Sequence, residues 1–291
     1  MTFNNDAQLD TSQISAGGGG GLGGGGLAVG GGAGLLIMIL GLVFGVDTSQ
    51  ITGSPGAPVE PGQRSAIEAC RTGADANRDD RCRVVGTVNS VQAFWSQELP
   101  QKYRPAQTVL YSGATRSGCG TASNQVGPFY CPLDQKIYID ASFFDELSSR
   151  YGADEGALAQ EYVVAHEYGH HVQNLLGVLG ASQRDPSGEK SGAVRVELMA
   201  DCLAGMWARD AATTKDANGR SFLQPLTEQD IASALSAAAA VGDDRIQEKV
   251  RGRVDPEAWT HGSAEMRQRW FTTGYNSTDI ERCDTFSTND L

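Results

Sequence analysis

Basic residues are scarce in this sequence, and none occurs before Arg64. The 291 residues carry 23 Lys and Arg against 35 Asp and Glu, which gives a formal net charge of −12. Nucleic-acid binding needs clustered basic side chains that neutralise phosphates, so this balance argues against a nucleic-acid partner. Histidine is also scarce, with four in the chain, and no C-x-x-C pair is present. A cysteine-rich zinc finger is therefore not expected.

The N-terminal part of the chain divides by composition into a tail, an apolar segment and a linker. Residues 1–32 are polar and then rich in glycine, and we expect a disordered tail there. Residues 27–46 form a stretch of 20 residues without a charge. We predict a transmembrane anchor over 33–46, or over the longer run that begins at residue 27. A signal-peptide core and a buried helix are the alternative interpretations. Residues 47–63 contain three prolines and predict a linker, which leaves 64–291 as one folded domain.

All six cysteines follow the apolar segment. An even number on one side of it predicts disulfides in an oxidising compartment, and therefore a domain on the extracytoplasmic side of the membrane. Proximity along the chain favours pairing the first with the second, the third with the fourth and the fifth with the sixth, among 15 possible pairings. Reduced, buried cysteines in a cytosolic domain are the alternative. The cysteines are Cys70, Cys82, Cys119, Cys131, Cys202 and Cys283.

Helices are predicted for most of the chain after residue 142. Short β-rich runs at 107–112 and 135–140 predict strands. A few strands followed by packed helices indicate an α+β domain, mostly helical with a small sheet. Helical spacing of apolar residues predicts helices over 84–97, 142–151, 154–176, 188–211, 227–241, 243–250 and 263–274.

One of these helices contains the string EYVVAHEYGHHVQ over residues 161–173. His166 and His170 are four residues apart, so their rings project from the same helical face. Both can then bind one zinc ion, with Zn–N bonds of about 2.0–2.1 Å. Glu167 is placed to act on a bound water as a general base, which completes the H-E-x-x-H pattern. His171 points away from this face, and we expect a structural or supporting role for it.

A catalytic zinc site needs a third protein ligand, and the next predicted helix offers one. The string RVELMADCLAG over 195–205 places Glu197 and Asp201 four residues apart. Glu197 is predicted to bind the metal, and Asp201 to accept the N–H of a ligating imidazole. A solvated acidic face is the alternative, but the residues on either side of the pair are apolar.

The strings HEYGHHVQ, RVELMADCLAG and THGSAEMRQRWFTTGY resemble the bacterial family of neutral zinc metallopeptidases. The resemblance extends through YSGATRSGCG, GPFYCPLDQKIYID, VGDDRIQ and GRVDPEAWTHGS, and it covers about residues 107–286. It implies a zincin-like fold, the H-E-x-x-H plus E-x-x-x-D plan of gluzincins, a single-pass membrane anchor and activity on peptide or protein substrates. The chain departs from the family in its tail, which lacks basic residues, and in its additional Cys70/Cys82 pair.

Together these observations predict a membrane-anchored zinc metalloendopeptidase. Zn²⁺ would lower the pKa of its bound water from 15.7 towards about 7, and Glu167 would take the proton as that water attacks the scissile carbonyl. The strand at 135–140 is expected to be an edge strand along which an extended substrate pairs. The alternative function is a non-catalytic, zinc-stabilised binding or scaffold module of the cell envelope.

The fourth histidine, His261, lies in the string THGS just before a predicted helix N-cap at Ser263. A zinc peptidase of this plan needs a donor to the oxyanion beyond the metal, and we expect His261 to be that donor. Tyr275 is the competing candidate, because a phenol could occupy the same place. A surface or capping role is the alternative for His261.

Overall fold

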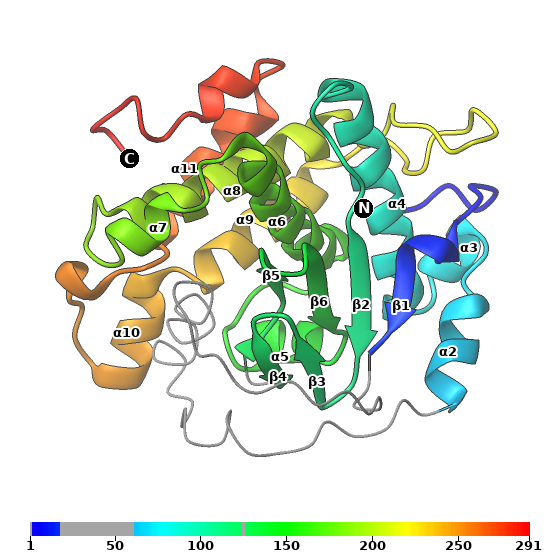
Figure 1. Cartoon of the computed structure of the whole chain (residues 1–291), viewed down its shortest axis with the longest axis horizontal. Helices are drawn as coiled ribbons and strands as arrows, with labels where there is room; N and C mark the ends of the chain where they lie inside the picture. The colour runs from blue at the N-terminus through cyan, green and yellow to red at the C-terminus, as the bar shows by residue number, and fades with distance from the viewer. Residues whose placement is uncertain (1, 18–60, 124–125) are drawn as a thin grey trace.

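A small sheet packed against long helices forms the framework of the protein (Figure 1). The structure is a computed structural model, and it describes residues 2–17, 61–123 and 126–291. The four-stranded sheet has the order β1-β2-β6-β5, in which β1, β2 and β6 are parallel and β5 is antiparallel to β6. The strands are β1 (Ile14–Ala16), β2 (Gln107–Tyr111), β5 (Phe129–Cys131) and β6 (Lys136–Asp140), and a separate hairpin contains β3 (Ala114–Ser117) and β4 (Gly120–Ser123).

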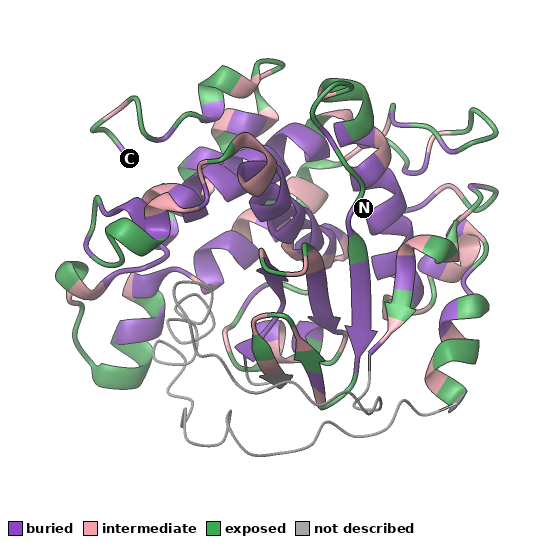
Figure 2. Ribbon diagram, viewed as in Figure 1, coloured by how far each residue is buried: buried purple, intermediate pink, exposed green. Residues whose placement is uncertain are grey.

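The helices agree with the α+β prediction, and all seven expected helices occur to within four residues at either end. Figure 2 shows that the central helices are buried along most of their length. The α-helices are α2 (Pro61–Glu68), α3 (Gly73–Ala76), α4 (Asp80–Glu98), α5 (Phe143–Ser149), α6 (Ala157–Leu176), α7 (Ala181–Arg184), α8 (Gly192–Asp210), α9 (Glu228–Ala240), α10 (Asp243–Arg251) and α11 (Ala264–Tyr275). Short 3₁₀ turns lie at Thr11–Gln13, Pro256–Ala258 and Ile280–Cys283.

Helices α6, α8 and α11 approach one another closely because glycine occupies their crossing points. A Cβ at Gly169 of α6 would lie 3.0 Å from the Ala200 Cα of α8. On the other side of α8, a Cβ at Gly205 or Gly274 would collide with backbone carbonyls of the facing helix. These contacts fix the positions of the three helices that carry the candidate site.

Residues 2–17 belong to the folded domain, so the prediction of a disordered tail over 1–32 is wrong for this stretch. Phe3 is fully buried, and β1 pairs in parallel with β2. The composition rule failed because it averaged this short stretch with the glycine tract that follows. The linker prediction over 47–63 also ends too late, because α2 begins at residue 61.

The predicted anchor at 33–46 lies outside the described residues, as do residues 18–32 and most of the linker. Within the ranges 2–17, 61–123 and 126–291, no helix has both the length and the hydropathy needed to cross a membrane.

All six cysteines form disulfides, in the pairing that proximity along the chain favoured. The first bond ties the end of α2 to α4, and the second ties the β3–β4 hairpin to β5. The third joins α8 to the C-terminal segment. These bonds are Cys70–Cys82, Cys119–Cys131 and Cys202–Cys283.

The strand predicted at 135–140 exists as β6, but the expectation that it is an edge strand is wrong. β6 lies between β2 and β5, and it pairs with both. The edges of the sheet are β1 and β5. Sequence alternation identified the strand, but the order of strands depends on β1 and β5, which the sequence analysis did not predict.

Candidate metal centre

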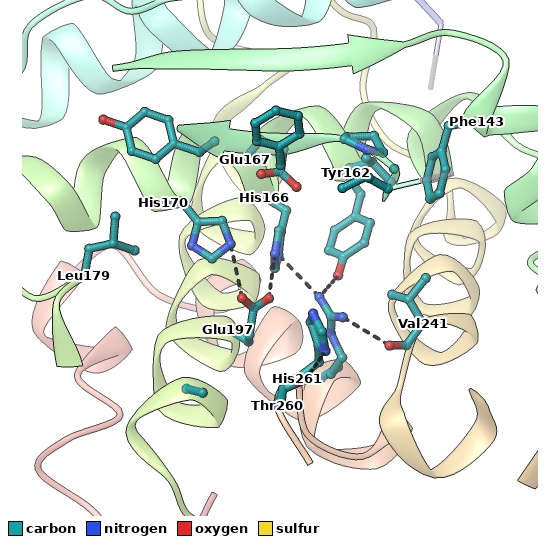
Figure 3. A pocket seen from close by; sticks show the side chains of 18 residues that line it. Phe143, Tyr162, His166, Glu167, His170, Leu179, Glu197, Val241, Thr260 and His261 are labelled. Carbon is teal, nitrogen blue, oxygen red and sulfur yellow. Dashed lines mark hydrogen bonds and ion pairs between the residues drawn. The ribbon is translucent and has the colours of Figure 1, made fainter. Parts of the chain in front are cut away.

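Helix α6 carries His166 and His170 on one buried face, and α8 brings Glu197 opposite them (Figure 3). The Nε2 atom of His166 lies 3.1 Å from Oε2 of Glu197, and Nε2 of His170 lies 3.5 Å from Oε1. One ligand atom from each of the three residues lies within 4.8 Å of the others. The structure therefore brings together the three residues that the sequence predicted as metal ligands.

A second set of polar side chains orients the two imidazoles. Asp201 Oδ1 lies 2.8 Å from Nδ1 of His166, and Gln173 Oε1 lies 2.8 Å from Nδ1 of His170. Gln173 is itself held by its amide, which donates to the carbonyl of Val196 on α8 at 2.5 Å. Both rings consequently point their Nε2 atoms at Glu197, as metal-ligating histidines with a hydrogen-bonded second nitrogen do.

Arg267 of α11 is part of this network, although the sequence analysis did not single it out. Its Nε and Nη2 atoms donate to the two carboxylate oxygens of Asp201 at 2.8 and 3.0 Å, and Nη2 also donates to the Tyr162 hydroxyl. Burial opposes ionisation of Asp201, but Arg267 and His166 hold the pKa of its carboxyl below the usual value. An ionised Asp201 is what the Nδ1–H of His166 requires as an acceptor.

The ligand set lies in a pocket with largely apolar walls. Glu167 also lines the pocket, one residue along α6 from His166, and it is not part of the three-residue ligand group. Burial raises the pKa of the Glu167 carboxyl, while the neighbouring histidines act in the opposite direction. The apolar walls come from several elements and include Val126, Phe129, Phe143, Val163, Leu179 and Val241.

His261 lies in the same pocket, on the loop between α10 and α11, as the sequence analysis expected. The loop is held by the buried carboxylate of Asp243, which accepts the backbone N–H groups of Thr260, His261 and Gly262 at 2.7, 2.6 and 3.0 Å. The other Asp243 oxygen lies 3.4 Å from Nδ1 of His261. Gly262 has φ +88, a conformation that favours glycine. Ser263 caps α11 through the Met266 N–H, as predicted.

Tyr275 does not lie in this pocket, so the alternative assignment of the oxyanion donor to it is wrong. It ends α11 and stacks on Phe271, while Arg267, two turns earlier, is the residue of this helix that lines the pocket. A helix rises 1.5 Å per residue, so the two ends of α11 cannot serve the same small site.

His171 lies outside the three-residue ligand group, as its position on the helix predicted. Its Nε2 donates to the Arg104 carbonyl at 2.6 Å, and its Nδ1 lies 3.1 Å from the Tyr130 hydroxyl on β5. Asn174 donates to the same hydroxyl at 3.0 Å. This side of α6 therefore fixes the edge strand beside the pocket.

The sequence profile of the family described as "Putative neutral zinc metallopeptidase" matches residues 4–286. The chain belongs to this family. It is 54% identical over its whole length to the uncharacterized protein Rv2575 of Mycobacterium tuberculosis, and all of that protein is covered. It is 38% identical to the uncharacterized protein YpfJ of Escherichia coli, with 96% of this chain and 95% of the relative covered. No solved structure matches the chain.

Two positioning residues of this metallopeptidase-family chain, Arg267 and Asp243, were missed by sequence reasoning. Both belong to strings that carry the family resemblance. In the sequence, however, Arg267 looks like a surface residue of a helix, and Asp243 looks like an ordinary acidic residue in the first turn of one. The role of Arg267 is visible only in its contact with Asp201, and the role of Asp243 only in its contact with the loop at 260–262.

Proposed function

We propose that this protein is a zinc-dependent peptidase with a zincin-like fold, which hydrolyses peptide bonds. One observation carries the proposal: two imidazoles and a carboxylate converge within 4.8 Å in a pocket that also contains a carboxylate outside the ligand set. Structural zinc sites are closed by four protein ligands, whereas catalytic sites use three and keep one position for water or substrate. Membership of the metallopeptidase family supports the same assignment.

The donor set fits zinc in type as well as in number. His166, His170 and Glu197 would hold the ion through two nitrogens and one oxygen, which is a combination found in catalytic zinc sites. The hydrogen bonds that the two imidazoles donate to Asp201 and Gln173 would keep both rings in the ligating orientation. When bound, zinc acidifies a water molecule and polarises the scissile carbonyl.

Glu167 is the general base in this proposal. Its carboxylate accepts a proton as water attacks the carbonyl, and then delivers that proton to the leaving amine. His261 donates a hydrogen bond to the oxyanion that forms, and Asp243 keeps its loop in place. The apolar side chains of the wall limit the bulk water around the reacting atoms.

The substrate-binding strand in this proposal is β5. β5 is the edge of the sheet next to the pocket, and Phe129 and Tyr130 line that pocket. An extended peptide could add to this edge as a further strand, with its side chains entering the apolar pocket. Peptide or protein substrates are the class that such an edge recognises.

We place the domain in an oxidising compartment, outside the cytoplasm, because all six cysteines are paired. Attachment to a membrane through residues 33–46 stays a prediction from the sequence.

The proposed function is tested by cleavage of a peptide library with the full chain. We expect cleavage to stop when zinc is removed with a chelator and to return when zinc is added. Cleavage that continues at the same rate after all metal has been removed would contradict the proposal. A protein that binds one zinc and cleaves no peptide would favour the binding-module alternative.

A further inference from the structure

Residues 2–17 and 61–291 pack together as one domain, although residues 18–60 separate them in the sequence. The apolar run at 27–46, which predicted a single membrane crossing, lies within that separating segment. The contacts between the two stretches therefore bear directly on how the chain is arranged relative to a membrane.

The first contact is made by Phe3, which is fully buried. Its ring fills a space beside α4, where a Cβ on Gly86 would come within 2.5 Å of the ring. The side chain of Asn77 fixes the backbone of the same residue. Asn77 Oδ1 accepts the Phe3 N–H at 2.9 Å, and its amide donates to the Phe3 carbonyl at 2.9 Å.

Further contacts continue along the stretch as far as the sheet. Asn89 of α4 accepts the Asp10 N–H at 2.7 Å and donates to the Asp10 carbonyl at 3.0 Å. Asp216 accepts the Gln8 N–H at 2.9 Å. β1 then pairs with β2 over three residues, from Ile14 opposite Thr108 onwards. These are direct, specific contacts of the kind found inside one folded domain.

A single crossing of a bilayer between residues 17 and 61 would separate the two stretches by a hydrocarbon core of about 30 Å. Hydrogen bonds of 2.7–3.0 Å cannot form across that distance. We infer that residues 2–17 lie on the same side of any membrane as residues 61–291, and that the chain does not cross a bilayer once between them.

Two crossings are also excluded by length. Each helical crossing needs about 20 apolar residues, whereas the apolar run at 27–46 is long enough for one crossing and the rest of 18–60 is rich in glycine, proline and polar residues. The conclusion would be the same if residues 2–17 of one copy packed on the domain of a second copy. Those residues would still lie on the side of the membrane that holds the folded domain. This inference replaces the single-pass topology predicted from the sequence with one in which residues 2–17 and residues 61–291 lie on the same side of the membrane.

The test uses single cysteines introduced into the full-length protein in intact cells. Because all six native cysteines are in disulfides, an introduced cysteine is the free thiol. Asp6→Cys reports on the N-terminal stretch and Glu98→Cys on the domain, since both positions are exposed. With a membrane-impermeant maleimide, we expect both variants to be labelled before the membrane is disrupted, or both only afterwards. Labelling of one variant before disruption and of the other only afterwards would overturn the inference.

A cross-link provides a second, independent measurement. Gln8 and Thr72 face each other as an antiparallel bridge, flanked by the Leu9–Arg71 and Gly73–Ala7 backbone hydrogen bonds. Such a non-hydrogen-bonded pair has Cα atoms about 4.5 Å apart, which suits a disulfide. The double variant Gln8→Cys/Thr72→Cys in the full chain should form an intramolecular bond on mild oxidation. The control Gln8→Cys/Glu98→Cys should not, and failure of the first pair to cross-link would contradict the inference.

Discussion

Replacing Asp243 by asparagine should loosen the loop that presents His261 without removing a ligand of the proposed metal site. One carboxylate oxygen accepts three backbone N–H groups, from Thr260, His261 and Gly262, at 2.6–3.0 Å. Asp243 is fully buried, so solvent does not weaken these bonds. The substitution keeps the shape of the side chain and removes its charge.

The magnitude follows from those three hydrogen bonds. A hydrogen bond to a charged group contributes about 1.5–3 kcal/mol, compared with about 0.5–1.5 kcal/mol for a neutral one. Losing about 1 kcal/mol at each bond lowers the free energy of unfolding by about 3 kcal/mol. Removing an oxyanion donor altogether costs about 10²–10³ in kcat, so misplacing His261 should lower kcat by about 10- to 100-fold.

The assay combines urea unfolding, zinc content and kcat on a peptide that the parent protein cleaves. Asp243→Asn should keep one zinc per chain while stability and kcat both fall. Glu248→Gln, an exposed change on the same helix, is the matched control and should alter neither. If Asp243→Asn retains parental stability and parental kcat, Asp243 does not hold the loop and the reasoning is refuted.

Three further predictions concern residues outside the ligand set. Burial raises the pKa of Glu161 to about 7, so its folded state keeps a proton that the unfolded state releases near 4.5. The free energy of unfolding should therefore fall by about 3 kcal/mol as the pH rises from about 4.5 to 7. Urea unfolding of Glu161→Gln should lack this fall, and the same pH dependence in the variant and the parent would show that Glu161 does not cause it. Phe3→Ala should lower the free energy of unfolding by about 3–5 kcal/mol, whereas the exposed control Thr2→Ala should not; equal stabilities would show that the N-terminal stretch is not docked. Tyr275→Phe should leave kcat unchanged, and a large loss would restore it as an oxyanion donor.

Local patterns in the sequence predicted the helices and the ligand spacing. The four-residue separation of His166 and His170 is a property of one helix, and the apolar residues around Glu197 predicted that its helix was buried. The structure brings these three residues together as expected. Disulfide pairing was also predictable, because each of the first two bonds joins cysteines that are near neighbours among the six.

Features that depend on distant contacts could not be predicted in this way. β1 is three residues long, and it forms only because β2 is available as a partner. Phe3 looks like an isolated apolar residue in a polar tail until the space beside Gly86 is known. Arg267 resembles a surface residue of an amphipathic helix, and its pairing with Asp201 depends on how α11 crosses α8.

The central claim is that Glu167 is the base of a zinc peptidase whose metal is held by His166, His170 and Glu197. The most direct measurement compares zinc content and peptide cleavage for Glu167→Gln and Glu197→Gln in the full chain. We expect Glu167→Gln to bind one zinc per chain and to cleave about 10²–10⁴ times more slowly than the parent, while Glu197→Gln loses zinc. Cleavage by Glu167→Gln at the parental rate, or full zinc retention by Glu197→Gln, would contradict the account.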